Sequence, residues 1–191
     1  MDPVCLKATG GGAGSPVLGR KFPRLIFMKQ KEKILASGCL LGERVRYDAQ
    51  VLKITDERIF RWAKEKRFIP ICPECMGGLW VPRDPCEIEQ GKTAQDVLDG
   101  KARILTQNGN DCTDDYLFGV QACVNMAKRH HVRLALLKQR SPACATQYVH
   151  DGHFNGQVVA GKGVLALALE RERILTFDET QLDQLENQLT D

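Results

Sequence analysis

Three cysteines, Cys39, Cys72 and Cys144, each follow a short apolar segment that is typical of a buried β-strand. The three segments cover residues 34–37, 68–71 and 134–137. The carboxyl ends of neighbouring strands in an open parallel sheet share one edge, and ligands bind at that edge. We therefore expect the three thiols to meet in one pocket. Because thiolates are soft ligands for metal ions and iron–sulfur clusters, the pattern predicts a metal or cluster site.

The cysteine spacing favours an iron–sulfur cluster over structural zinc. A structural zinc site needs a second C-x-x-C or an H-x-x-x-H at ordinary spacing, and the sequence has neither. A four-iron cluster normally takes four cysteines, so three strand-end cysteines leave one iron free to bind and polarise a substrate atom. Cys75 leaves this point open, because it can supply a fourth ligand, stand nearby as a spare thiol, or face the core.

Cys72 and Cys75 also form a C-x-x-C, which is found in thiol–disulfide oxidoreductases. In that chemistry the motif opens a helix whose dipole lowers the pKa of a thiol, whereas here Gly77 and Gly78 are expected to break any helix. A further alternative is a non-catalytic iron–sulfur or zinc-binding module with Cys75 as the fourth ligand.

Glu74 and Ser141 stand close in sequence to two of these cysteines and are expected at the rim of the same pocket. There a carboxyl group can exchange a proton with a substrate, and a hydroxyl group can orient it. Both residues can equally serve structure alone, Glu74 by capping a loop and Ser141 by an ordinary turn hydrogen bond. The residues themselves leave the two interpretations open.

Several other polar residues have structural interpretations. Arg83 and Glu87 are expected to form an ion pair, and His150 and His153, which flank a predicted turn, are expected at the surface. Two aspartates are expected to fix loops, Asp48 and Asp111. The remaining cysteines belong to no shared pattern and are interpreted as small buried hydrophobes: Cys5, Cys86, Cys112 and Cys123.

Strand and helix patterns alternate along the chain after residue 33. The predicted strands are 34–37, 68–71, 132–137 and 174–177, with a weaker one near 102–106. The predicted helices are 56–65 capped by Thr55, 113–130 capped by Thr113, 164–169 and 179–189, with a hairpin tip at Asp151–Gly152. This alternation indicates an α/β fold: a single three-layer, Rossmann-like domain with a short parallel sheet and helices on its faces.

The composition indicates the cellular compartment and the class of substrate. A secretion signal and a membrane-length apolar segment are both missing from the 191 residues, so eight cysteines indicate the reducing cytoplasm rather than a disulfide framework. Residues 1–33, which include a glycine-rich stretch, are interpreted as a disordered leader or an appended extension, and residues 34–191 as the domain. Residues 1–33 hold seven of the 27 basic groups and two of the 24 acidic ones, which leaves the domain a net charge of −2. That charge favours a small substrate over RNA, which a basic track would bind.

The ordered motifs resemble one family. Its first signature is similar to residues 36–42 with Val45-Arg46-Tyr47-Asp48, its second to residues 71–74 with Gly77-Gly78-Leu79 and Pro82-Arg83, and its third to residues 137–144 followed by Asp151-Gly152 and residues 161–164. This is the small bacterial family that includes the thiouracil desulfurases, and the resemblance covers about residues 34–189. The chain departs from the usual family pattern at Ala49, Cys75 and Ala145, and the three candidate ligands survive these changes.

The resemblance implies a [4Fe-4S] cluster held by Cys39, Cys72 and Cys144, with its fourth iron free to take a thiocarbonyl sulfur. It implies removal of sulfur from a thiolated pyrimidine of the 2- or 4-thiouracil type to give the oxo base. It also implies that Glu74 is the acid/base carboxyl group and that Ser141 orients the substrate. Iron discriminates soft sulfur from oxygen, which agrees with this chemistry.

Overall fold

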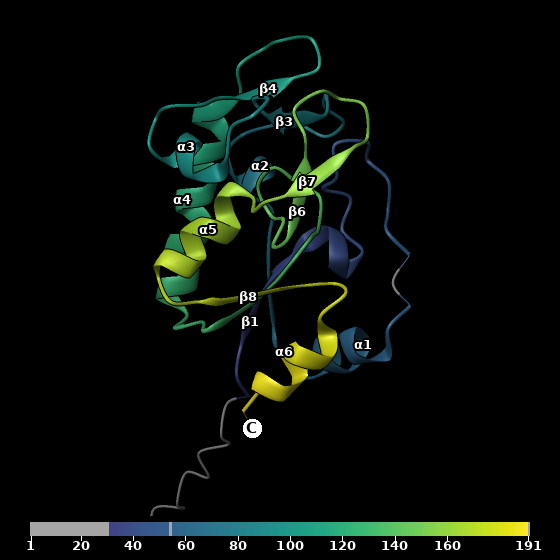
Figure 1. Cartoon of the computed structure of the whole chain (residues 1–191). Coiled ribbons are helices and arrows are strands. Elements are labelled where there is room, and N and C mark those ends of the chain that lie inside the picture. The colour runs from purple at the N-terminus through teal and green to yellow at the C-terminus, as the bar shows by residue number, and fades with distance from the viewer. Residues whose placement is uncertain (1–30, 54, 191) are drawn as a thin grey trace, which may run out of the picture.

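The centre of the fold is a parallel sheet of four strands in the order β2-β1-β5-β8. The computed structural model describes residues 31–53 and 55–190 (Figure 1). The strands are β1 (Ile34–Ser37), β2 (Phe68–Ile71), β5 (Leu134–Leu137) and β8 (Leu175–Asp178). Ser37 pairs with Ile71 and Leu137 pairs with Asp178, so the strands end at a common edge. The predicted α/β class and parallel sheet are confirmed.

Helices cover both faces of this sheet, because side chains alternate along each strand. Leu35 of β1 belongs to one apolar core, together with residues of α4 (Thr113–Arg129) and α5 (Val164–Arg171). Its neighbours Ile34 and Ala36 belong to the opposite core, with residues of α1 (Glu57–Lys64) and α6 (Leu182–Gln188). Figure 1 shows the two helix pairs on opposite sides of the strands. The three layers follow from this division.

Two small antiparallel pairs lie beyond the carboxyl edge of the sheet, at the top of Figure 1. β3 (Cys86–Ile88) pairs with β4 (Ile104–Thr106), and β6 (Tyr148–His150) pairs with β7 (Val158–Ala160). The weak strand near 102–106 is therefore real, and the predicted tip at Asp151–Gly152 lies in the β6–β7 connection. The short helix α3 (Ala94–Leu98), which starts with a capping box of Thr93 and Asp96, is an element that the sequence patterns missed.

Two predicted helix caps and one predicted helix start are wrong, whereas the predicted start of α4 at Thr113 is right. Asp56, not Thr55, caps α1, because its carboxylate accepts the Arg58 N–H at 2.9 Å. Thr113 is the first residue of α4, and the Asp111 carboxylate accepts its N–H at 2.9 Å. Helix α6 begins at Leu182 rather than at residue 179, because the Asp178 carboxylate binds the N–H and hydroxyl groups of Thr180 in a turn before the helix.

The cysteine-containing segments after β1 and β2 both form single helical turns. A 3₁₀ turn, η1 (Gly38–Leu41), contains Cys39, and the one-turn helix α2 (Pro73–Met76) follows Cys72 directly. The expectation that Gly77 and Gly78 break any helix agrees with the structure: α2 has four residues and ends at Gly77. Pro73 occupies its first turn, where the missing N–H of proline costs nothing.

The interpretation of residues 1–33 as a leader falls almost entirely outside the described residues. In the part of the chain that the structure describes, no helix combines the length and apolar composition needed to cross a membrane.

Candidate active site

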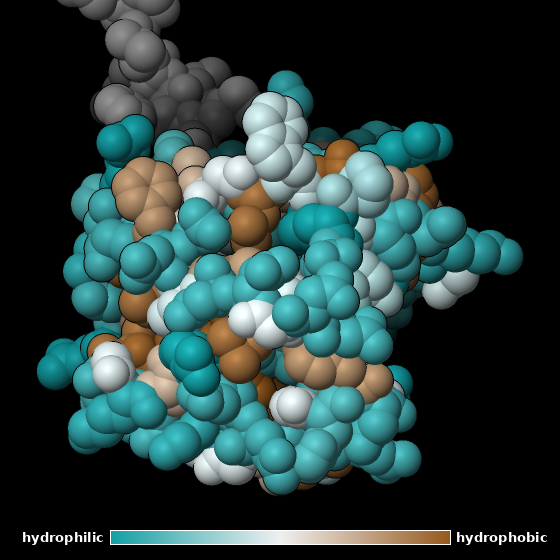
Figure 2. Space-filling view, turned by 90° about the horizontal axis from the view of Figure 1, so that it is seen from above, coloured by the Kyte–Doolittle hydropathy of each residue, from teal (hydrophilic) through white to brown (hydrophobic). Residues whose placement is uncertain are grey.

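All three strand-end cysteines line one cavity of about 450 Å³ at the carboxyl edge of β2, β1 and β5. Seen from above in Figure 2, the molecule is mainly hydrophilic, with hydrophobic residues showing in small patches between polar side chains. Among the described residues, no three His, Cys, Asp or Glu side chains are placed to hold a single metal ion. Cys39, Cys72 and Cys144 instead share the lining of this cavity.

Tight local turns hold these cysteines in place. The 3₁₀ turn that contains Cys39 ends at Gly42, whose φ of 88° a residue with a side chain rarely adopts. Cys144 N–H donates to the Ser141 hydroxyl oxygen at 3.2 Å. A side chain at Gly163 would come within 2.3 Å of the Ala143 backbone, so the start of α5 packs directly on the turn that precedes Cys144.

Burial disfavours the charged form of the candidate ligand thiols. It raises the pKa of Cys39 to about 11, against the opposing charge of Lys138. Burial also raises the pKa values of Cys72 and Cys144, and neighbouring acidic groups and thiols add to the effect. Ligation requires thiolates, and the positive charge of iron stabilises them in a site that otherwise disfavours charge. The three soft donors around one cavity therefore fit an iron–sulfur cluster.

Glu74 lines the cavity and forms an ion pair with Arg83, not the predicted pair between Arg83 and Glu87. Arg83 Nε donates to Glu74 Oε2 at 2.7 Å, and the same guanidinium donates to the carbonyl oxygens of Val45 at 2.9 Å and Trp80 at 3.1 Å. The side chain of Glu74 is 15% exposed and that of Arg83 is 8% exposed. Arg83 thus fixes the Glu74 carboxylate at the wall of the cavity and joins the loops on either side.

Ser141 also lines the cavity, and its hydroxyl oxygen accepts the N–H groups of Ala143 and Cys144, both at 3.2 Å. These are the turn hydrogen bonds that the structural interpretation expects. A hydroxyl group carries one hydrogen of its own, which these accepted bonds leave available for a substrate. The geometry is therefore compatible with both interpretations of Ser141.

Glu87 and His150 are cavity residues that the sequence interpretation misplaced. The Glu87 side chain is buried, and its carboxylate accepts the N–H groups of Gly152 at 2.9 Å and Phe154 at 3.2 Å. His150 is half-buried beside it, with 3.9 Å between His150 Nδ1 and Glu87 Oε1, so it is not the surface residue that was predicted. The one signal in the sequence was a charged residue between apolar Cys86 and Ile88, an unusual place for a carboxylate.

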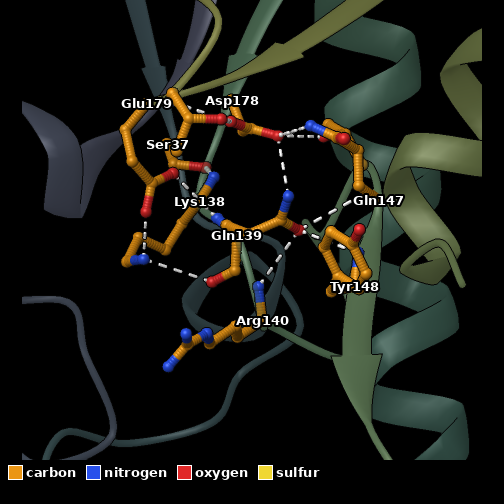
Figure 3. Close-up of polar contacts among 10 residues, drawn as sticks. Ser37, Lys138, Gln139, Arg140, Gln147, Tyr148, Asp178 and Glu179 are labelled. Carbon is orange, nitrogen blue, oxygen red and sulfur yellow. Dashed lines mark hydrogen bonds and ion pairs between the residues drawn. The ribbon is translucent and has the colours of Figure 1, made fainter. Parts of the chain in front are cut away.

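A polar network at the ends of β5 and β8 holds the loop that contains Ser141 and Cys144. Figure 3 shows Gln139 at its centre: its amide donates to Asp178 at 2.7 Å and accepts backbone N–H groups on both sides of the loop, including that of Tyr148 at 3.2 Å. Burial opposes ionisation of Asp178, but hydrogen bonds from threonine and glutamine side chains outweigh it and lower its pKa.

Two neighbouring groups complete this network. Lys138 pairs with Glu179, and the Lys138 backbone N–H donates to the Ser37 hydroxyl at 3.1 Å (Figure 3). Because Ser37 ends β1, this bond ties the first cysteine turn to the third.

Cys75 lies beside the cavity but is not among its described lining residues. Its sulfur is 3.8 Å from the Val45 carbonyl oxygen, and the Cys72 sulfur lies at the same distance from that atom. The oxidoreductase interpretation needs a thiol with a lowered pKa, and that of Cys72 is raised instead.

The cysteines outside the motif behave mainly as buried apolar residues. Cys86, Cys112 and Cys123 are buried, and Cys86 also contributes to the cavity wall; Cys5 lies outside the described residues. Two predicted loop aspartates do hold loops: Asp111 accepts the Thr113 N–H, and Asp48 accepts the Gln50 N–H at 3.0 Å.

Comparisons with known proteins agree on one family. The family model of 2-thiouracil desulfurase matches residues 34–181. The uncharacterized protein YbbK of Bacillus subtilis (strain 168) is 35% identical over 152 residues, which are 80% of this chain and 99% of YbbK. A solved structure described as the [4Fe-4S]-dependent thiouracil desulfidase TudS is similar with a TM-score of 0.74 and 36% identity, over 82% of this chain and 96% of that one. This chain belongs to the 2-thiouracil desulfurase family.

Proposed function

We propose that this protein is a [4Fe-4S]-dependent enzyme that removes sulfur from a thiolated pyrimidine of the 2- or 4-thiouracil type and releases the oxo base. The observation that carries the proposal is the convergence of Cys39, Cys72 and Cys144 on one cavity that Glu74 and Ser141 also line. Membership of the desulfurase family and similarity to a [4Fe-4S]-dependent desulfidase support the activity and the cofactor.

Three cysteines would hold the cluster: Cys39, Cys72 and Cys144. When bound in this way, the cluster offers an iron without a protein ligand, which attracts soft thiocarbonyl sulfur and polarises its bond to carbon.

The protein side chains would transfer the protons and orient the substrate. Glu74, positioned by Arg83, accepts a proton from the water that adds to the ring carbon and returns it to the departing group. The Ser141 hydroxyl donates its free hydrogen to the substrate and so orients the ring. Exchange of C=S for C=O with water releases one sulfide and requires no net transfer of electrons.

The setting that we propose is a single Rossmann-like desulfurase domain of residues 34–191 in the cytoplasm, after a separate extension of residues 1–33. Support comes from a family match that starts at residue 34 and from seven free cysteines among the described residues. The net charge of −2 beyond residue 33 supports a free small molecule over RNA.

A turnover assay tests the proposal directly. Anaerobically purified protein should convert 2-thiouracil or 4-thiouracil to uracil with one sulfide released per uracil, without added reductant. Sulfide release that depends on an added electron donor would contradict the hydrolytic mechanism.

The second candidate function is a non-catalytic cluster-binding module, favoured by the approach of Cys75 and Cys72 to the same carbonyl oxygen. Replacement of Cys75 by alanine separates the two candidates, because an open three-cysteine site keeps its iron and a closed four-cysteine site loses it. Cys72→Ala should lose iron in either case, and Cys123→Ala serves as the matched control in the core.

A further inference from the structure

The buried carboxylate of Glu87 binds the backbone of one loop at the cavity. Glu87 Oε2 accepts the N–H groups of Gly152 and Phe154, which belong to the connection between β6 and β7. Glu87 is only 7% exposed, and the hydrogen bonds to these N–H groups are charge-assisted. A buried carboxylate of this kind would be costly without such partners, so the loop conformation is strongly fixed.

The loop holds Phe154 in an unusual backbone conformation. Its φ is +55°, in a region that bulky residues rarely adopt, and the residue persists there because its N–H is bound by Glu87. Gly152 makes the approach possible, since a side chain there would come within 2.7 Å of the backbone of Gln90 and Ile88. The result is a half-buried aromatic side chain in the wall of the cavity that the cysteines line.

We propose that Phe154 determines specificity for a planar heterocycle by stacking on the ring of the substrate, and that Glu87 is a positioning residue that acts through Phe154. This inference rests on the proposed function, because it names the part of the site that recognises the ring. Open iron recognises a thiocarbonyl sulfur wherever it occurs, whereas an aromatic face discriminates a pyrimidine from an acyclic thioamide. Ring recognition and sulfur recognition are thus separate properties of the cavity.

Uracil is the probe that isolates ring recognition, because it has the ring and no sulfur. We expect Phe154→Leu to weaken uracil binding to the cluster-loaded protein roughly 5- to 150-fold by calorimetry, the range that loss of a base–aromatic stack produces. Phe154→Tyr, which keeps the ring, should stay within about threefold of the parent. Phe118→Leu, a change of the same type on the exposed face of α4, should have no effect.

A double-mutant cycle tests whether Glu87 acts through Phe154. Glu87→Leu removes the acceptor and should weaken uracil binding as Phe154→Leu does, whereas Glu87→Gln keeps an acceptor oxygen and should restore most of it. In the Glu87→Leu background, Phe154→Leu should cause no further loss. The visible spectrum of the cluster, measured on every variant, shows that each has folded around its cofactor.

The outcomes separate this inference from the proposed function. Uracil binding that depends on Phe154 in a protein without desulfurase activity would leave the inference standing and overturn the proposed function. Undetectable uracil binding to the parent protein, or uracil binding that Phe154→Leu leaves unchanged, would overturn the inference. Independent, additive losses from the Glu87 and Phe154 changes would overturn the positioning role of Glu87.

Discussion

At the scale of single residues, the Glu74–Arg83 pair is the feature most closely tied to the chemistry. Arg83 contacts Glu74 and two carbonyl oxygens of the surrounding loops, so the carboxyl group is fixed at the cavity wall. The sequence places Glu74 beside Cys72 and so predicts its location. It could not choose the partner of Arg83, because Glu74 and Glu87 are both near it along the chain and only the path of the loops decides between them.

Replacing Glu74 by glutamine should therefore remove proton transfer and leave the cofactor in place. We expect kcat for 2-thiouracil to fall roughly 10²- to 10⁴-fold, the usual contribution of general acid–base catalysis, with iron content unchanged. Steady-state kinetics and iron analysis on the same preparation measure both quantities. Glu57→Gln, on the exposed first turn of α1, is the control, and a Glu74→Gln variant with full activity would exclude Glu74 as the proton-transfer group.

Asp178 is a second residue on which the site depends, because its charged carboxylate accepts the hydrogen bonds that hold the loop of Ser141 and Cys144. Its folded pKa is lowered from 3.8, so the stabilisation it provides is complete above that value and is lost as pH falls through the lowered pKa. Asp178→Asn should cost about 2–3 kcal/mol of unfolding free energy near pH 7, with a smaller difference from the parent protein near pH 3. Urea unfolding at several pH values measures this, and a difference independent of pH would show that the charge of Asp178 is not involved.

At the scale of elements, the site depends on how closely α2 packs against α4. A side chain at Gly119 of α4 would come within 1.7 Å of the Pro73 carbonyl oxygen, and one at Gly77 within 2.0 Å of the Asp115 carbonyl oxygen. The two helices therefore meet through backbone atoms. This contact sets the position of α2, and with it the positions of Cys72 and Glu74.

Enlarging Gly119 should displace the second ligand turn. We expect Gly119→Ala to destabilise the protein by about 1–3 kcal/mol, as overpacking does, and to lower iron content, because Cys72 moves with α2. Thermal unfolding and iron analysis test this, with Gln121→Ala on the exposed side of α4 as control. Parent-like stability and iron content would show that α2 can move without disturbing the site.

The elements differ in how well the sequence predicted them. The central strands β1 and β5 are predictable because both of their faces are buried, which leaves continuous apolar runs such as residues 134–137. The paired strands β3–β4 and β6–β7 have three residues each, too few to show a period, and their pairing depends on contacts distant in sequence. Glu87, Phe154 and His150 lie on or beside these short elements. Their positions in the cavity wall could therefore not be predicted from the sequence.

At the scale of the whole molecule, the topology explains why three separated motifs make one site. The order β2-β1-β5-β8 places the strands that precede Cys72, Cys39 and Cys144 side by side, and the parallel direction puts all three cysteines at one edge. A cavity of about 450 Å³ is in the size range of small-molecule sites. The layered α/β framework thus provides a rigid base, and the two antiparallel pairs close the cavity over it.

The presence of an open [4Fe-4S] cluster is tested most directly on anaerobically purified protein. Iron and acid-labile sulfide are measured per chain, and the visible spectrum is recorded before and after addition of 2-thiouracil. We expect about four irons and four sulfides per chain and a spectral change on addition of the thio-base. Zinc in place of iron, or no metal after anaerobic reconstitution, would contradict it.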